Sequence, residues 1–278
     1  MPHLDNLLFS FLIYIGSFFA GLLGSLTGLG GGVVVVPMLT VLFGVDIHFA
    51  AGASLISVIA TSSGSASAYV KEGYSNIRIG MFLEMATTIG AVVGALLAGI
   101  LSANAISIIF AGILVYSAFS SILRRKGNVT YTEEDKYAKL LKLNGEYPTG
   151  NGMERYSARN VPFGFGLSSL AGVMSGLLGI GGGAIKVIAM DRIMKIPFKV
   201  STTTSNFMIG VTAAASAGIY LKNGFIHAAL VMPVMLGVLT GAFLGAKVLT
   251  TASSKTLKVV FTVIILVLAF EMLKNGLK

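Results

Sequence analysis

Two glycine clusters interrupt the apolar sequence of this chain. The first is Gly30–Gly32, within "TGLGGGVVVVP", and the second is Gly181–Gly183, within "LGIGGGAIKVI". Glycine tolerates positive φ and close backbone approach. A helix that begins at such a cluster leaves its first N–H groups free, at the positive end of its dipole. Because this arrangement binds anions, each cluster is a candidate anion-binding site.

Two charged residues within the apolar segments could add to this chemistry. Lys186 follows Gly183 by three residues, and an ionisable side chain at membrane depth is a functional hypothesis. We expect Lys186 to hold the charge of an anion; the alternatives are snorkelling to the interface or pairing with Asp191. Glu84 could carry a coupling proton, although we favour an interfacial ion pair with Arg78 or another basic group.

Hydroxyl and amide side chains lie near the start of two further segments, about 50–70 and 201–221. They are Ser54 in the first, and Thr202, Thr203, Thr204, Ser205 and Asn206 in the second. These residue types commonly cap helix N-termini. The sequence leaves open whether they are caps or whether Ser54, Thr204, Ser205 and Asn206 line the anion site.

The composition is that of an all-α polytopic membrane protein. Hydrophobic residues make up 55% of the 278 positions and charged residues 11%, with a mean hydropathy of +0.86. Apolar blocks long enough, or nearly so, to cross a core of about 30 Å occupy residues 7–27, 79–101, 104–123, 227–249 and 257–273. The three histidines are scattered and cysteine is absent, so the sequence predicts neither a metal site nor thiol chemistry.

The chain repeats itself in one register. A shift of 151 residues places Gly30–Gly32 on Gly181–Gly183, Ser54 on Ser205 and Tyr69 on Tyr220 without a gap. We therefore divide the chain into a first membrane repeat (1–123), a polar linker (124–160) and a second membrane repeat (161–278). The two tyrosines are expected in the aromatic belts, and residues 132–143 in a surface amphipathic helix.

The basic residues predict that the two repeats are inverted. If each glycine cluster separates the two arms of a helical hairpin, each repeat has five segments, and 15 of the 20 Lys and Arg residues fall on the side of the linker. Three fall on the other side. The positive-inside rule then makes the linker cytoplasmic and the protein a multi-pass component of the cell membrane, with 8 to 10 membrane segments in all. The net charge of +9 reflects this topology rather than nucleic-acid binding.

The segment after each glycine cluster is short. Residues 33–43 and 184–194 each form about 11 residues of helix, which span about 16 Å or half of the hydrocarbon core. The glycines would then lie near the midplane, where irregular backbone lines a cavity or is buried in protein. Inverted repeats with broken helices are how many secondary transporters form a substrate site; the alternative is a glycine turn that only allows close helix packing.

These features resemble the sulfite exporter TauE/SafE family of membrane permeases. The resemblance rests on the doubled G-x-G-G-G at Gly28–Gly32 and Gly179–Gly183, on Pro37, and on the motifs "AAGASL" (50–55) and "STTTSN" (201–206). It implies export or uptake of sulfite, sulfonates or related small anions. Lys186 and Ile188 depart from the family pattern, in which the second short segment is apolar and contains a proline.

The sequence therefore predicts a secondary transporter for a small anion, in contact with membrane lipids, with a coupling proton as a further candidate partner. An anion channel or a transporter of small carboxylates is the alternative. An intramembrane enzyme is disfavoured because no nucleophile or metal set is recognisable, and no Walker pattern is present. No cofactor is expected.

Overall fold

The computed structural model describes residues 6–27, 31–71, 75–122, 135–149, 152–248 and 254–277. The helices of the first half are α1 (Asn6–Thr27), α2 (Gly32–Leu42), α3 (Ile47–Lys71), α4 (Ile77–Ala98) and α5 (Ala103–Ile122). The polar segment contains α6 (Lys136–Leu140), β1 (Gly145–Thr149) and β2 (Gly152–Tyr156). The second half contains α7 (Val161–Leu178), α8 (Gly183–Ile188), the π-helical turn η1 (Ala189–Ile193), α9 (Phe198–Lys222), α10 (Ala228–Val248) and α11 (Ser254–Gly276).

The expected class, an all-α membrane protein, is confirmed. Four helices among the described residues are long and apolar enough to cross a membrane: α1 over Leu7–Gly24, α4, α7, and α10 over Ala228–Gly245. The short helix α2 is buried over eight of its residues, from Gly32 to Leu39. A helix that is apolar on all sides belongs inside a bundle, so α2 lies in the core and the longer helices surround it.

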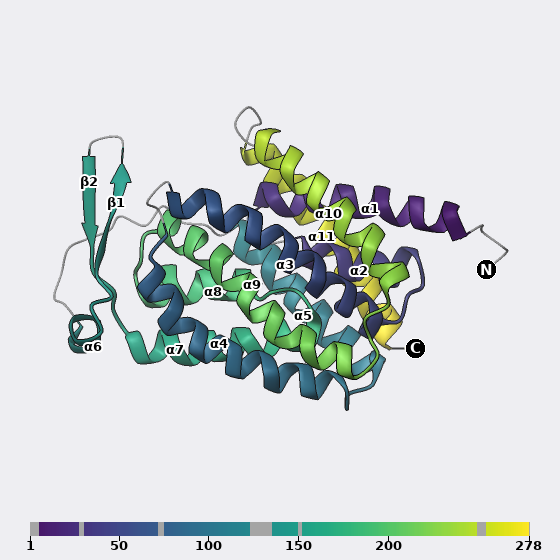
Figure 1. Cartoon of the computed structure of the whole chain (residues 1–278), viewed down its shortest axis with the longest axis horizontal. Coiled ribbons are helices and arrows are strands. Elements are labelled where there is room, and N and C mark those ends of the chain that lie inside the picture. The colour runs from purple at the N-terminus through teal and green to yellow at the C-terminus, as the bar shows by residue number, and fades with distance from the viewer. Residues whose placement is uncertain are drawn as a thin grey trace.

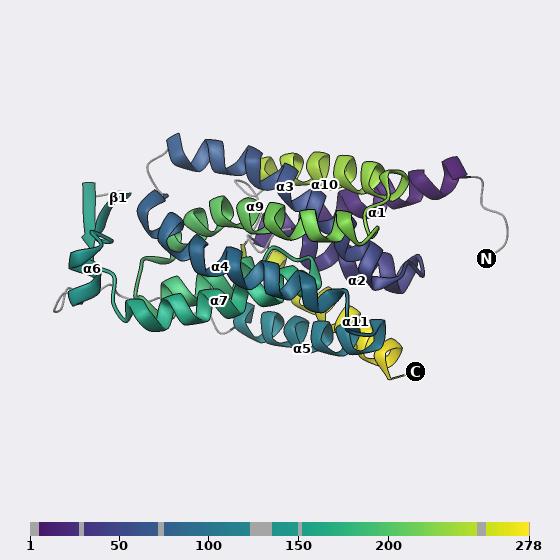
Figure 2. The same ribbon diagram turned by 60° about the horizontal axis from the view of Figure 1, so that its bottom comes forward.

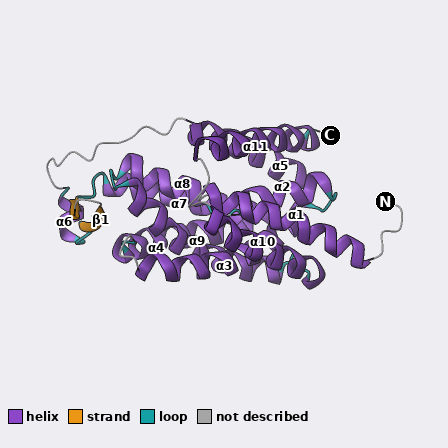
Figure 3. Ribbon diagram, turned by 90° about the horizontal axis from the view of Figure 1, so that it is seen from above, coloured by secondary structure: helices purple, strands orange, loops and turns teal. Residues whose placement is uncertain are grey.

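The polar segment lies at one end of the bundle. Figures 1 and 2 show α6, β1 and β2 there, while the start of α1 and the end of α11 lie toward the opposite end. The same separation is seen from above in Figure 3. The long helices run roughly along the axis that joins these two ends.

The two halves of the chain interlock helix by helix. The main partners are α1 with α10, α4 with α7, α3 with α9, and α5 with α11. In each of these pairs one helix comes from each half. The hydrophobic core is therefore shared between the halves.

Close crossings of the helices occur at equivalent residues of the two halves. A Cβ on Gly21 of α1 would meet the backbone of Val238 on α10 at 2.3 Å, and one on Gly172 of α7 would meet the backbone of Thr87 on α4 at 2.1 Å. Each residue of the second contact corresponds to one of the first through the 151-residue register. Glycine is required at both positions because the partner backbone occupies the space of a side chain.

The polar segment differs from its prediction. Within 132–143 the described helix is α6, with five residues, and an antiparallel hairpin that the sequence did not predict follows it. Tyr156, at the end of this hairpin, is buried, and its hydroxyl accepts a hydrogen bond of 2.7 Å from Nδ2 of Asn76, the N-cap of α4. Burial raises the pKa of Tyr156 above its ordinary value of 10.0, against the smaller opposite effect of the bond from Asn76. The hairpin is thereby held against the start of α4.

Candidate functional site

The second glycine cluster adopts a backbone that requires glycine. Gly179, Gly181 and Gly182 have φ angles of +71°, +73° and +66°, in the left-handed region that other residues rarely occupy. The space is also closed: a Cβ on Gly181 would lie 2.6 Å from Cγ2 of Ile209, and one on Gly182 would lie 2.7 Å from the carbonyl oxygen of Ala171. The loop between α7 and α8 is therefore a tightly held turn in the core.

The first glycine cluster has a different backbone. Gly31 caps α2 with φ −62° and ψ −25°, an ordinary helical conformation; Gly30 lies outside the described residues. Close approach is the reason for glycine here, since a Cβ on Gly32 would lie 2.6 Å from Oγ of Ser54 and 3.2 Å from the carbonyl oxygen of Gly179. Gly32 of the first cluster therefore lies against Gly179, at the start of the loop that carries the second cluster.

The two short segments are also unequal. α2 is a continuous helix of 11 residues, long enough to orient its free N–H groups and its dipole at Gly31 and Gly32. α8 has only six residues and continues into η1, where the amide of Met194 donates to the carbonyl of Ala189. The backbone argument for an anion site therefore applies to α2, while α8 contributes a side chain instead.

Ser54 and Ser205 are not helix caps, and that interpretation was wrong. α3 begins at Ile47 and α9 at Phe198, so both serines lie about two turns inside their helices. The Ser54 hydroxyl donates to the carbonyl of Gly179 at 2.7 Å, and the Ser205 hydroxyl donates to that of Gly183 at 3.3 Å. Both residues therefore support the second glycine cluster.

The structure separates the remaining polar candidates. Thr204 accepts a hydrogen bond of 3.0 Å from the amide of Asn76, so it lies toward the hairpin end of the bundle, and Asn206 is half-buried on the same helix. Tyr220, expected in an aromatic belt, is instead buried and donates to the carbonyl of Leu177. The side chain of its counterpart Tyr69 lies outside the described residues.

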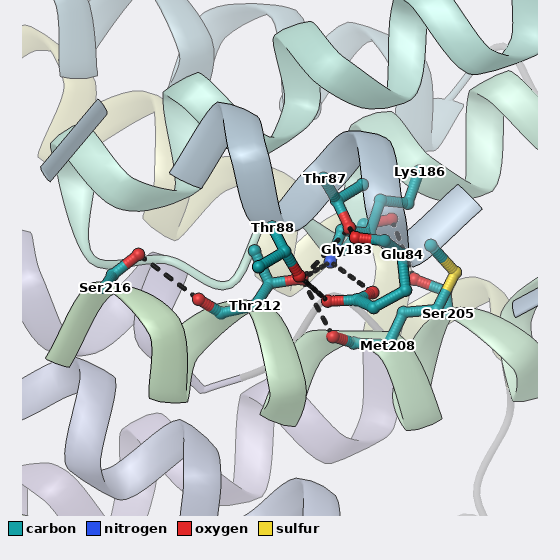
Figure 4. Close-up of polar contacts among 9 residues, drawn as sticks. All are labelled: Glu84, Thr87, Thr88, Gly183, Lys186, Ser205, Met208, Thr212 and Ser216. Carbon is teal, nitrogen blue, oxygen red and sulfur yellow. Dashed lines mark hydrogen bonds and ion pairs between the residues drawn. The ribbon is translucent and has the colours of Figure 1, made fainter. Parts of the chain in front are cut away.

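Lys186 lies in the interior, next to Glu84. Its side chain is fully buried in the first turn of α8, and its Nζ lies 3.9 Å from Oε2 of Glu84 on α4. Figure 4 shows both side chains pointing toward Thr212 of α9, whose hydroxyl accepts a hydrogen bond from Lys186 and donates one of 2.6 Å to Oε1 of Glu84. Glu84 therefore pairs with a basic group other than the exposed Arg78, and the expected interfacial location of this pair is wrong because both side chains are buried. Snorkelling of Lys186 is equally wrong, and the ion pair that the structure gives it is with Glu84 rather than Asp191.

Burial makes this pair electrostatically significant. Among the described residues, Glu84 and Lys186 are the charged side chains that the fold buries. At this separation, unit charges attract by about 4 kcal/mol at an effective dielectric constant of about 20, which offsets part of the cost of removing both from water. Each buried charge is therefore stabilised by its partner, and removing that partner requires another ion with the partner's sign to take its place.

Several hydroxyls around this pair were missed from the sequence. Thr212 bridges the two charges, Thr88 donates to Oε1 of Glu84 at 3.2 Å, and Thr87 lies 3.4 Å from the Thr212 hydroxyl. Ser175 of α7 is buried beside Gly182, and its hydroxyl has no hydrogen-bond partner. Isolated threonines and serines in apolar helices are common, so only the fold reveals which of them converge.

Comparison with known proteins decides the family. The family described as Sulfite exporter TauE/SafE matches residues 13–272, which is nearly the whole chain. The chain belongs to this family. Among TauE/SafE relatives, it is 26% identical over 276 residues to the "probable membrane transporter protein YunE" of Bacillus subtilis, covering 97% of this chain and 98% of the relative.

Two further TauE/SafE relatives carry similar names. The "probable membrane transporter protein YdhB" of Bacillus subtilis is 28% identical, covering 85% of this chain and 89% of its own. A "probable membrane transporter protein" of Xylella fastidiosa is 25% identical, covering 94% of both chains. No solved structure matches the chain significantly. Family and relatives together make this TauE/SafE protein a membrane transporter.

Proposed function

We propose that this protein is a secondary transporter of the cell membrane that moves a small anion, such as sulfite or an organic sulfonate, by alternating access. The observation that carries the proposal is the fully buried ammonium of Lys186, which follows the glycine loop between α7 and α8. A buried cation at a backbone break is suited to bind an anion inside the membrane. The matching family, described as sulfite exporters, supports the substrate class.

The proposed site consists of Lys186, the glycines of both clusters and the polar residues next to them. Gly31 and Gly32 would contribute the free amides at the start of α2, and Ser54 and Ser205 would keep the second cluster in its left-handed conformation. Asn206 and Thr204 would line the approach from the hairpin end. Gly30 is included through the sequence repeat alone.

We further propose that the two halves are inverted repeats around this site. The reciprocal pairing of α1 with α10 and of α7 with α4, through equivalent glycines, is what a two-fold relationship between the halves requires. The position of the polar segment opposite the ends of the chain (Figure 1) agrees with five passes in each half. The count of basic residues orients the linker to the cytoplasm, and the exposed apolar side chains of α4 and α10 would face lipid.

Uptake into proteoliposomes tests this proposal. Purified protein is reconstituted, and uptake of labelled sulfite, thiosulfate, sulfoacetate, methanesulfonate and acetate is compared with uptake by empty vesicles. We expect saturable uptake of at least one sulfur-containing anion, accelerated by the same unlabelled anion inside the vesicle, because a carrier exchanges its substrate. Preference for acetate would redirect the substrate to carboxylates, and uptake that the internal anion does not accelerate would indicate a channel.

A further inference from the structure

The two oxygens of the Glu84 carboxylate have different environments. Oε1 accepts hydrogen bonds from Thr212 at 2.6 Å and from Thr88 at 3.2 Å. Oε2 is buried without a hydrogen-bond partner and lies 3.9 Å from Nζ of Lys186, which is beyond hydrogen-bond distance. A buried carboxylate oxygen with no donor is costly, so this oxygen is where a proton would be accommodated.

Lys186 and Glu84 are linked by a hydroxyl rather than by a direct hydrogen bond. The Thr212 hydroxyl accepts from the ammonium, and its one proton has two acceptors within reach, Oε1 of Glu84 at 2.6 Å and the carbonyl of Met208 at 2.9 Å. An ammonium has three donors, and the bond to Thr212 engages one of them. Another anion can therefore approach Lys186 without first breaking a direct bond between the two charges.

The fold does not require charged side chains at the positions of Glu84 and Lys186. Through the 151-residue register, Lys186 corresponds to Val35, Glu84 to Met235 and Thr212 to Thr61. Val35 is fully buried in α2, and Thr61 donates to the carbonyl of Ser57 within its own helix. Two of the three corresponding residues in the other half are therefore apolar, and the charged pair occurs in one half only.

Among the described residues, no other charged side chain on the elements around the pair is buried. α7, the main partner of α4, carries no charged side chain. The lysines of α9, Lys199 and Lys222, lie near its ends and are exposed, as is Arg78 on α4 itself. Asp191 and Arg192 belong to η1, which follows α8. Glu84 therefore has Lys186 as its counter-ion. A bound anion that neutralises Lys186 therefore removes the charge that balances the Glu84 carboxylate.

We infer that Glu84 couples anion transport to a proton, an inference that rests on the proposed function. In the empty site the Glu84 carboxylate neutralises Lys186. A bound anion takes over this role, and two negative charges beside one ammonium in a low-dielectric interior repel each other. The carboxylate then takes one proton from water to become a carboxylic acid, with the proton at Oε2, and returns it when the anion leaves. One proton accompanies each anion in the same direction.

Methanesulfonate is a suitable probe because its charge does not change across the neutral pH range. In wild-type vesicles, a more acidic pH on the side of the anion should accelerate uptake several-fold, and one proton should enter with each anion. Glu84→Gln, which resembles the protonated acid, should still exchange internal for external anion but should lose the response to the pH gradient. Met235→Gln, which places the same amide side chain at the equivalent position of the other half, should keep that response.

The outcomes separate this inference from the proposed function. Wild-type vesicles that transport none of the tested anions would refute the function itself. If wild-type protein transports an anion without any response to the gradient, or if Glu84→Gln keeps the full response, the coupling role is refuted while transport stands. If Glu84→Gln does not fold, a dye that reports pH decides the question: the wild-type protein, mixed in detergent with the anion that it transports, takes up one proton per bound anion or it does not.

Discussion

Nζ of Lys186 lies 3.9 Å from Oε2 of Glu84, although the two residues are 102 positions apart and belong to opposite halves of the chain. The hydroxyl of Thr212 joins them. This contact places the buried charges of the described residues side by side in the interior, next to the glycine turn at Gly182. In the proposed function, the same pair determines both the stability of the interior and its ability to bind an anion.

The ion pair should show strong non-additivity in stability. Glu84→Met and Lys186→Val each leave one buried charge without its partner, which typically costs about 3–5 kcal/mol. The double variant gives this layer the side chains of its equivalent in the other half, and it should be more stable than either single variant. Thermal unfolding of the four proteins in detergent measures this. Additive losses would mean that the two charges do not interact.

The glycine turn should tolerate no side chain. Gly182→Ala places a Cβ in a left-handed conformation, which costs about 1–2 kcal/mol, and 2.7 Å from the carbonyl oxygen of Ala171. We expect a lower unfolding temperature and loss of transport. Gly218→Ala on α9 is the matched control, since nothing lies within 4 Å of its Cβ and alanine favours a helix by about 1 kcal/mol. Equal behaviour of the two variants would contradict the role given to the turn.

The polar hairpin should stay docked up to strongly alkaline pH. Burial favours the neutral form of Tyr156 and raises its pKa above 10.0. Its contribution to docking is therefore complete below pH 10.0 and is lost as pH rises through the higher pKa of the docked state. Tyr156→Phe removes the hydroxyl that Asn76 contacts and should increase hydrogen exchange in β1 and β2 at neutral pH. Protection factors of β1 and β2 that fall in wild-type protein well below pH 10 would argue against this contact.

Cysteine labelling tests the inverted topology, because the sequence contains no native cysteine. Met153→Cys in the hairpin and Leu277→Cys near the end of the chain both replace exposed side chains. An impermeant reagent applied to intact cells should label the second and spare the first, which should react only after the membrane is opened. Labelling of both sites from the same side would exclude an odd number of passes in the second half.

The sequence predicted the features that depend on a continuous stretch of the chain, such as apolar length and the internal repeat. Apolar length predicted α1, α4 and α10, which are long and apolar enough to cross a membrane. The 151-residue register identified the two glycine segments that the fold places in contact, at Gly32 and Gly179. The sequence failed where the partner comes from a distant helix. Glu84 was assigned to Arg78 because Arg78 is near in sequence, whereas the fold brings Lys186 and Thr212 to it. The caps at Ser54 and Ser205 were misplaced because α3 begins at Ile47 and α9 at Phe198, seven residues before each serine.

The concentration dependence of anion uptake by Lys186→Met tests the central claim most directly. Methionine keeps the length of the side chain and removes its charge, so the apparent substrate constant should rise about tenfold or more, which corresponds to about 1.4 kcal/mol of lost interaction. Lys222→Met, which removes an exposed lysine at the end of α9, should leave the constant unchanged. A folded Lys186→Met protein with wild-type substrate affinity would contradict the claim that the buried lysine binds the transported anion.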